Sequence, residues 1–333
     1  MKYHQIIAAL GCAMFTITLA EAKTITVDNK EGSVAMFTSV QTACNAADPG
    51  DTILIAGSPN FYGDLMITKR LNLVGPGYLL NENGIPGITK DGASLGSVTF
   101  GLIQLSSSNN SSAIGLSIAA AVISVGVNNI TYDRCSLYNS SFGGVVSITR
   151  SWLATCTLQY PGSSIRNSIF GGQGCELRNG TTASNCILPA PENLSSVAGS
   201  SISSSIFIIS TNVTAATFAV RAKGSVTHSL AVGGLGIGGN PTFLPSGNGN
   251  ISTVAFTVQA FVQGQTNDKA YVLAAGSPAI GSGLNGVDMG IFGGVQPYVI
   301  SGVPSLPRIT RFLVPSTATS TSGLRIEMDA QSF

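Results

Sequence analysis

Charged side chains are scarce in this chain. Only 9% of its 333 residues are Asp, Glu, Lys or Arg, and the formal net charge is +1. A protein that binds nucleic acid or an anionic membrane surface by electrostatic attraction needs a basic excess, so we expect no nucleic-acid partner. The apolar content of 44% also excludes a disordered chain that is kept extended by its charges.

Residues that ligate metals or carry acid–base chemistry are equally few. His228 is the one histidine beyond residue 22, and no Cys-x-x-Cys pair occurs, so we predict no metal site. Between residues 92 and 267 the acids are Asp133, Glu176 and Glu192. No two of these acids are adjacent in the sequence. His228 is expected to lie on the surface as an isolated side chain.

Cysteine is infrequent, and its number beyond residue 22 is odd. The five residues are Cys44, Cys135, Cys156, Cys175 and Cys186. An odd set leaves at least one thiol unpaired or intermolecular. Export would permit a disulfide such as Cys175–Cys186. Buried free thiols are the simpler interpretation, because Cys135 and Cys186 share a repeated inward position.

Long apolar runs are absent after residue 22. The apolar stretch 113–127 is short for a bilayer and contains Gly and Ser, so we predict no membrane span in the mature chain. The start resembles a signal peptide: a positive Met1-Lys2, an apolar core at 6–19, and the cleavage signal Ala20-Glu21-Ala22. Cys12 lies inside the apolar core, which disfavours a lipoprotein. We therefore expect a secreted or cell-surface protein.

A short repeated pattern is abundant between residues 128 and 234. Its clearest copy is Ile165-Arg166-Asn167-Ser168-Ile169-Phe170-Gly171-Gly172, and weaker copies recur at intervals of roughly 16 to 24 residues. The aligned copies share one column of small residues: Cys135, Ser151, Ser168, Cys186, Ser205 and Ser229. A period of this length is typical of a solenoid, in which each strand and turn stacks on the next. The column is expected inside the coil.

The segment after the signal peptide resembles a known family. A strand at 24–28 precedes a helical segment at 37–47 with Ser39 as its N-cap. The sequences Gly-Asp-Thr-Ile at 50–53, Phe-Tyr-Gly at 61–63 and Ile-Thr-Lys-Arg-Leu-Asn-Leu-Val-Gly at 67–75 follow. This order is similar to the opening of secreted right-handed parallel β-helix proteins of the pectin-lyase-like superfamily. In that family the helix caps the first coil.

A second block resembles the closing segment of many bacterial secreted β-helix proteins. It comprises Asn-Pro-Thr-Phe at 240–243, Gly-Ser-Pro-Ala-Ile at 276–280 and Asp-Met-Gly at 288–290. Asn240 and Met289 replace the usual Asp and Ile. The two blocks bracket residues 24 to 294. The resemblance concerns architecture more than activity, because the superfamily includes lyases, hydrolases and proteins with no known catalysis.

We therefore predict an all-β fold, a right-handed single-stranded parallel β-helix. Residues 1–22 are the signal peptide, residues 23–295 the β-helix domain with an N-terminal helical cap, and residues 296–333 a Pro-rich extended tail. An open final coil would pair edge to edge with other chains, so the tail is expected to cap it. A sorting or anchoring element is the alternative for the tail.

The resemblance implies two chemistries, a lyase with a calcium-binding carboxylate cluster and a hydrolase with two carboxylates. Asp133 and Glu176 are expected two or more coils apart, roughly 10 Å, which is too far for such a pair. A non-catalytic structural or glycan-binding protein is thus the leading expectation. The alternative is a polysaccharide lyase or glycoside hydrolase acting on acidic polysaccharide such as pectin, with Ca²⁺ in the lyase case. Its candidate residues are Asp64, Glu82, Asp91 and Asp133.

Four residues are candidates for binding a polysaccharide or cell-surface glycan. Arg134 and Arg150 share the column before the small residue and are expected to form an outward basic stripe, although a solvated face is the simpler interpretation. Tyr132 and Trp152 supply aromatic rings that suit sugars, although they also suit core packing. Adhesion to a regular surface such as ice would need rows of Thr, and the sequence has no sustained Thr-x-Thr repeat.

Overall fold

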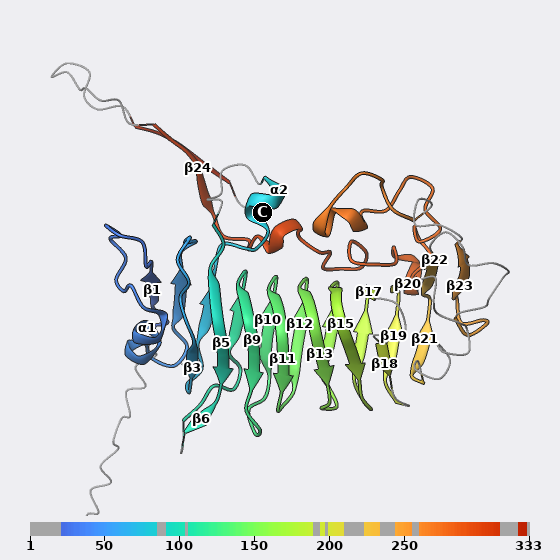
Figure 1. Ribbon diagram of the computed structural model, residues 1–333, viewed down its shortest axis with the longest axis horizontal. Coiled ribbons are helices and arrows are strands. Elements are labelled where there is room, and N and C mark those ends of the chain that lie inside the picture. Colours follow the sequence, from blue (N-terminus) through green and yellow to red (C-terminus); the bar gives the residue numbers. More distant parts are fainter. Residues whose placement is uncertain are drawn as a thin grey trace, which may run out of the picture.

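Short strands with alternating apolar residues stack into a parallel β-solenoid (Figure 1), so the predicted fold class is confirmed. The computed structural model describes residues 21–84, 91–103, 106–188, 194–196, 199–209, 223–233, 244–254, 260–313 and 326–331. Residues 1–20 of the predicted signal peptide (1–22) and the Asn-Pro-Thr-Phe segment at 240–243 lie outside these residues. No described helix is both long enough and apolar enough to cross a membrane.

Two long parallel sheets form the walls, and successive coils add strands to each in turn. Sheet A contains β1 (Thr24–Val27), β2 (Thr52–Ile55), β4 (Asn72–Val74), β8 (Ser112–Ile114), β10 (Ile130–Asp133), β12 (Val146–Thr149), β14 (Ser164–Arg166), β16 (Thr182–Ser184), β19 (Ser201–Ser203) and β21 (Ser225–Thr227). Sheet B contains β3 (Leu65–Ile67), β5 (Ser94–Phe100), β9 (Ser117–Ile123), β11 (Ser136–Phe142), β13 (Trp152–Leu158), β15 (Ile169–Leu177), β17 (Ile187–Leu188), β18 (Leu194–Ser196), β20 (Ile206–Ile209), β22 (Leu230–Gly233) and β23 (Ile251–Val254).

The core lies between the sheets, and one position of each sheet A strand fills it from that side. In register from coil to coil, this position holds buried residues: Ile25, Ile53, Leu73, Ala113, Tyr132, Ile148, Ile165, Ala183, Ile202 and Val226. Their neighbours on both sides point outward, because side chains alternate along a strand. The register holds although the coils differ in length, from 16 residues (130 to 146) to 40 residues (72 to 112).

The predicted Ser/Cys column lies inside, where the chain passes from sheet A to sheet B. All six side chains are fully buried. Ser151 Oγ accepts a hydrogen bond from the backbone N–H of Cys135 (3.0 Å) and donates one to the carbonyl of Thr149 (2.7 Å). Ser168 and Ser205 repeat this pattern. A small side chain with a polar tip thus satisfies backbone groups that the turn buries, which explains why the column conserves its chemistry from coil to coil.

The described thiols agree with the interpretation of buried free cysteines. Cys44, Cys135, Cys156 and Cys186 are buried and free, so Cys186 forms no disulfide with Cys175. Burial raises the pKa of the Cys135 and Cys186 thiols to about 12. These side chains therefore behave as small apolar core residues.

The predicted N-terminal cap is present. Helix α1 (Val40–Ala46) begins after Ser39, whose Oγ accepts a hydrogen bond from the Thr42 N–H (3.4 Å). Its buried side chains Val40, Ala43 and Cys44 join the core at the open end of the first coils. The short helix α2 (Leu80–Asn83) interrupts the next coil, and the small antiparallel pair β6 (Leu102–Ile103) and β7 (Ser106–Ser107) extends from it.

The C-terminal segment is extended, but its described part does not lie over the final coil. It contains the 3₁₀ turns η2 (Asn267–Tyr271), η3 (Leu284–Gly286) and η4 (Ile300–Gly302), and it runs back along the outside of the solenoid (Figure 1). Val303 reaches Arg134, and Ser301 reaches Asn83 near the first coils. We call residues 277–307 the strap. Beyond it, β24 (Arg308–Leu313) and β25 (Glu327–Gln331) form an antiparallel hairpin that leaves the body.

The strap covers an apolar column that the sequence displays. The residue after the Ser/Cys column points outward, and it is apolar in the later coils: Trp152, Ile169, Ile187, Ile206 and Leu230. Met289 and Ile291 of the strap pack on this column and are themselves buried. Sealing this surface is therefore a structural role of the closing block that the sequence analysis identified.

Candidate ligand-binding face

The residue before the Ser/Cys column has a left-handed backbone conformation in successive coils. The φ angle is 56° at Arg134, 49° at Arg150, 46° at Asn167, 53° at Asn185 and 49° at Ser204. Asn adopts this conformation at low cost, whereas Arg and Ser do so less readily. We call this line of residues the corner, and it lies beneath the strap.

Corner side chains hold the strap through its backbone. Asn167 Nδ2 donates to the carbonyls of Ile291 (2.9 Å) and Gly293 (2.7 Å). Asn185 Nδ2 donates to the carbonyl of Asp288 (3.0 Å), and Ser204 Oγ accepts from the Leu284 N–H (2.9 Å). These contacts join residues about a hundred positions apart, so a single-sequence pattern does not reveal them.

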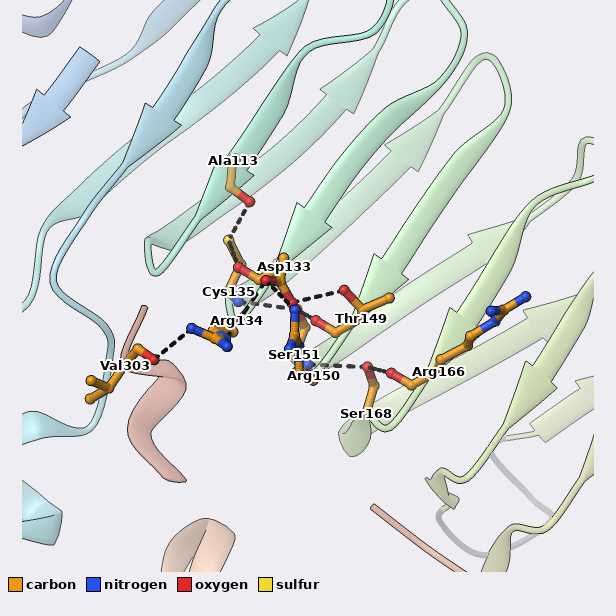
Figure 2. A network of polar contacts seen from close by, with 10 residues as sticks. All are labelled: Ala113, Asp133, Arg134, Cys135, Thr149, Arg150, Ser151, Arg166, Ser168 and Val303. Atoms are coloured by element: carbon orange, nitrogen blue, oxygen red, sulfur yellow. Dashed lines mark hydrogen bonds and ion pairs between the residues drawn. The ribbon is translucent and has the colours of Figure 1, made fainter. Parts of the chain in front are cut away.

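Arg134 and Arg150 do not form the exposed basic stripe that the sequence predicted. Arg150 donates Nε and Nη2 hydrogen bonds to the two oxygens of Asp133 (2.8 and 2.7 Å), and Thr149 Oγ1 donates a third (2.8 Å). Arg134 is 8% exposed and donates to the carbonyl of Val303 on the strap (3.0 Å; Figure 2). Burial and the nearby Arg150 lower the pKa of Arg134. The cluster is an internal ion-pair network that anchors the strap.

Tyr132 is a core residue, which corrects its placement among the ligand-binding candidates. Its side chain is fully buried, with ring centroids 5.9 Å from those of Phe100 and Phe142. It holds the inward position of β10, between Ala113 and Ile148 in register. Burial raises the pKa of its hydroxyl well above the usual value, and that hydroxyl has no hydrogen-bond partner within the described structure.

Trp152 is also committed to packing. Its indole lies over Gly171 of the next coil, where a Cβ atom would come within 2.4 Å of the ring. The ring centroid of Tyr271, which precedes the strap, is 6.5 Å away. Trp152 thus begins the covered apolar column instead of offering a free face to a sugar.

Two of the four carboxylates proposed for a lyase or hydrolase, Asp64 and Asp133, lie on well-separated coils. Glu82 is exposed on α2, and Asp91 precedes β5. Asp64 precedes β3 and accepts a hydrogen bond from the Ser97 N–H (2.8 Å). Asp64 and Asp133 lie on coils separated by the two coils β4/β5 and β8/β9, roughly 14 Å at the strand spacing. Glycosidase carboxylates lie about 5 to 9.5 Å apart.

A calcium site is equally unsupported by the arrangement of these acids. Calcium needs six to eight oxygen ligands, several of them carboxylates. Within the described ranges no three His, Cys, Asp or Glu side chains come together at metal-binding distance. Asp133, the most buried of the four candidates, is occupied by Arg150 and Thr149. The residues present therefore do not fit the calcium ion of the lyase alternative.

The outer face of sheet A carries a feature that the sequence analysis missed. One outward position of every strand forms a continuous row of hydroxyl side chains with one amide, Asn72, among them. We call it the hydroxyl row: Thr24, Thr52, Asn72, Ser112, Thr131, Ser147, Ser164, Thr182, Ser201 and Ser225. Ser112 donates to Asn72 Oδ1 (2.9 Å), and no other hydroxyl of the row bonds to a described residue. The row is uncharged and is spaced at about 4.8 Å.

A sequence signal for this row did exist. From Thr131 to Ser225, a Ser or Thr stands four positions before each member of the Ser/Cys column. Because Ser and Thr alternate irregularly and the coils differ in length, the row does not look like a Thr-x-Thr repeat. The sequence has no sustained Thr-x-Thr repeat, and the row agrees with this, because it mixes Ser and Thr and includes Asn72.

A second outward row lies beside the strap, two positions later in each strand. This strap-side row changes character along the solenoid: Thr26, Leu54, Val74, Ile114, Asp133, Thr149, Arg166, Ser184, Ser203 and Thr227. After Thr26 the row is apolar through Ile114, carries the charged Asp133 and Arg166 on either side of Thr149, and is hydroxylated from Ser184 onward. The Asp133 cluster therefore divides the face into two halves of different chemistry.

In the late half, the strap-side row and the strap enclose a polar groove of about 580 Å³. Its polar lining residues include Arg166, Thr182, Ser184, Ser203, Asn285 and Gln296. Arg166 is exposed and forms no ion pair with a described residue. Figure 2 shows its side chain directed away from the Asp133 cluster. The groove can therefore offer hydroxyls, amides and one free guanidinium to a ligand.

Comparisons with known proteins concern the fold. No protein-family model matches the chain, and no curated protein matches its sequence. A crystal structure of the pectate lyase Pel9A is similar in structure, with 11% sequence identity and a TM-score of 0.48, covering 82% of this chain and 96% of that chain. At this identity and score the likeness carries no argument about fold or activity.

Proposed function

We propose that the protein is a non-catalytic, secreted or cell-surface β-helix that binds polysaccharide on the outer face of sheet A. The observation that carries this proposal is the free guanidinium of Arg166 in a groove otherwise lined by hydroxyl and amide groups. Sugars are bound by planar polar side chains and hydroxyls, and a guanidinium pairs with a carboxylate or sulfate.

The length of the face supports a polymeric ligand. The hydroxyl row crosses all ten strands of sheet A, and two of its members, Thr182 and Ser201, also line the polar groove. Unbonded hydroxyls at a regular spacing can exchange hydrogen bonds with an extended chain of sugars at many points. The cost of each individual contact is low, because these hydroxyls have no protein partner to lose.

The scattered carboxylates disfavour catalysis. A glycosidase holds two carboxyl groups on either side of one bond, and Asp64 and Asp133 are roughly three strand spacings apart. Asp133 is buried and forms an ion pair with Arg150. A polysaccharide lyase or hydrolase is therefore the alternative, and it is tested directly by product release.

The test is affinity electrophoresis and product analysis with a panel of acidic and neutral polysaccharides, with and without calcium. We expect retardation by at least one acidic polysaccharide and no release of unsaturated or reducing ends. Arg166→Gln should reduce the retardation at least severalfold. Arg178→Gln is the matched control, because Arg178 is exposed and paired with Glu176 outside the groove. Product release, or equal effects of the two substitutions, would contradict the proposal.

A further inference from the structure

The early half of the same face contains a second groove, of different chemistry. Its volume is about 620 Å³, within the usual range for small-molecule sites. Its apolar walls include Val34, Leu54, Pro76, Pro304, Leu306 and Pro307. We call it the apolar groove.

Local sequence explains why this groove is apolar. The strap-side row is Leu54, Val74 and Ile114 in the early coils, where the later coils place Thr149, Ser184 and Ser203. The strap crosses Gly115, where an added Cβ would lie 3.2 Å from Pro304. Val74 is 8% exposed, whereas Leu54 is only half-buried. The strap thus covers part of this apolar strip and leaves the part at β2 open.

The rim of the groove exposes apolar side chains on two sides. Val34 is 101% exposed on the loop that follows β1, and Leu306 is 40% exposed on the strap. The polar lining residues are Thr26, Asp28 and Ser33. Asp28 accepts a hydrogen bond from the Lys30 N–H (3.0 Å), and Lys30 Nζ lies 3.6 Å from its carboxylate. The groove therefore presents no unpaired charge, which favours an uncharged chain as its occupant.

The apolar groove borders the hydroxyl row. Thr24 and Thr26 lie on one strand, as do Thr52 and Leu54, so one strand reaches the row with one side chain and the groove with the other. A ligand bound here would contact both hydroxyls and apolar walls, because side chains two positions apart on one strand supply them. That combination suits an amphipathic molecule better than a purely polar or a purely apolar one.

We propose that the apolar groove binds the alkyl or acyl chain of an amphipathic carbohydrate, whose sugar lies on the hydroxyl row. The proposal rests on the proposed glycan binding only for its sugar part. The chain would fill the space between the strand β2 and the strap, where it removes apolar surface of Leu54, Val34 and Leu306 from water. The gain should therefore grow with chain length until the groove is full.

The experiment measures the binding of methyl, butyl, hexyl and octyl β-glucosides by calorimetry, each below its micelle-forming concentration. We expect the affinity to rise about fourfold for each added methylene, equivalent to roughly 0.8 kcal/mol. An octyl chain on an oligoethylene glycol head keeps the apolar part and lacks the sugar, so it should bind severalfold more weakly than octyl glucoside. Affinity independent of chain length, or equal affinity for the two heads, would overturn the proposal.

Variants locate the site. Val34→Asp and Leu306→Asp place a charge on the rim at exposed positions, so the fold should persist, and each should weaken octyl glucoside binding at least tenfold. Val125→Asp is the matched control, because Val125 is 78% exposed and does not line the groove. An equal loss with Val125→Asp would overturn the assignment. If polysaccharides still retard the protein but the affinity for glucosides does not depend on chain length, only this inference is refuted. If the affinity rises with chain length but no polysaccharide retards the protein, only the proposed polysaccharide binding is refuted.

Discussion

Replacement of Asn167 by alanine tests whether corner amides hold the strap. Asn167 is 6% exposed, and its Nδ2 donates two hydrogen bonds to strap carbonyls. A net hydrogen bond contributes about 0.5–1.5 kcal/mol, so the loss of two costs about 1–3 kcal/mol. Alanine at a φ of 46° adds about 1 kcal/mol, because Asn tolerates the left-handed region better. We expect the strap to be destabilised by about 2–4 kcal/mol.

The readout should be local, because a solenoid need not unfold in one step. Hydrogen exchange at strap amides is suitable, since the Gly290 N–H bonds to the Ser204 carbonyl (2.8 Å) and the Met289 N–H to the Ala279 carbonyl (2.9 Å). Their exchange should accelerate by a factor of about thirty to several hundred. Amides of sheet A far from the strap should change much less.

Two further variants separate the contributions. Asn167→Gly removes the amide and relieves the backbone, so it should cost about 1–3 kcal/mol. Asn248→Ala is the control for backbone strain, because Asn248 has a φ of 53° and an exposed side chain. It should leave strap exchange nearly unchanged. Strap protection that responds equally to Asn167→Ala and Asn248→Ala would refute the reasoning.

Four other predictions follow from buried polar groups. Asp133→Asn leaves Arg150 without its counter-charge and should lower the free energy of unfolding by about 3–5 kcal/mol. Denaturant titrations measure this, and a loss below about 1 kcal/mol would contradict the reasoning. Tyr132→Phe removes a buried hydroxyl that has no partner, so thermal unfolding should show stability unchanged or raised by about 1 kcal/mol, whereas clear destabilisation would argue against the assignment. Tyr78 and Tyr298 are buried, and their hydroxyls form a hydrogen bond with each other. Burial raises the pKa of both, so their contribution to stability should be present below the unfolded pKa near 10 and decline as the pH rises beyond it. Denaturant titrations at alkaline pH would measure this decline. The buried thiols of Cys44, Cys135 and Cys186, whose pKa is raised, should not react with a thiol reagent at neutral pH until the protein unfolds. Rapid labelling of the native chain would contradict their burial.

Residues with a repeated local role were predictable. The Ser/Cys column was placed inside because small side chains recur with apolar residues two positions later, and Phe170, Leu188 and Phe207 do fill the core. The capping helix and its Ser39 N-cap were also read correctly, since a helix start depends on a few neighbouring residues. These features are set by alternation, period and capping, which act over short stretches of chain.

The candidate site was not predictable in the same way. Arg134 and Arg150 were expected on one outer face, and both lie on it. Arg150 is paired with Asp133, and Arg134 is covered by the strap, so neither is free. Tyr132 was placed outside, although the strand alternation assigns it to the same inward column as Ile148. Arg166 stands one place before the corner, on the strap-side row, and this offset is what leaves it free in the polar groove.

The sequence by itself determined that this chain coils into a parallel β-solenoid, because the direction of each side chain relative to the core depends only on the alternation within its own strand. The tertiary structure alone decided which outward residues are available to a ligand. That outcome depends on where the strap lies, and the strap is held by contacts such as Asn167 to Gly293 and Arg134 to Val303, which span 126 and 169 positions. With the strap held there, the middle of the outer face is a covered ion-pair cluster. A polar groove lies on one side of this cluster and an apolar groove on the other.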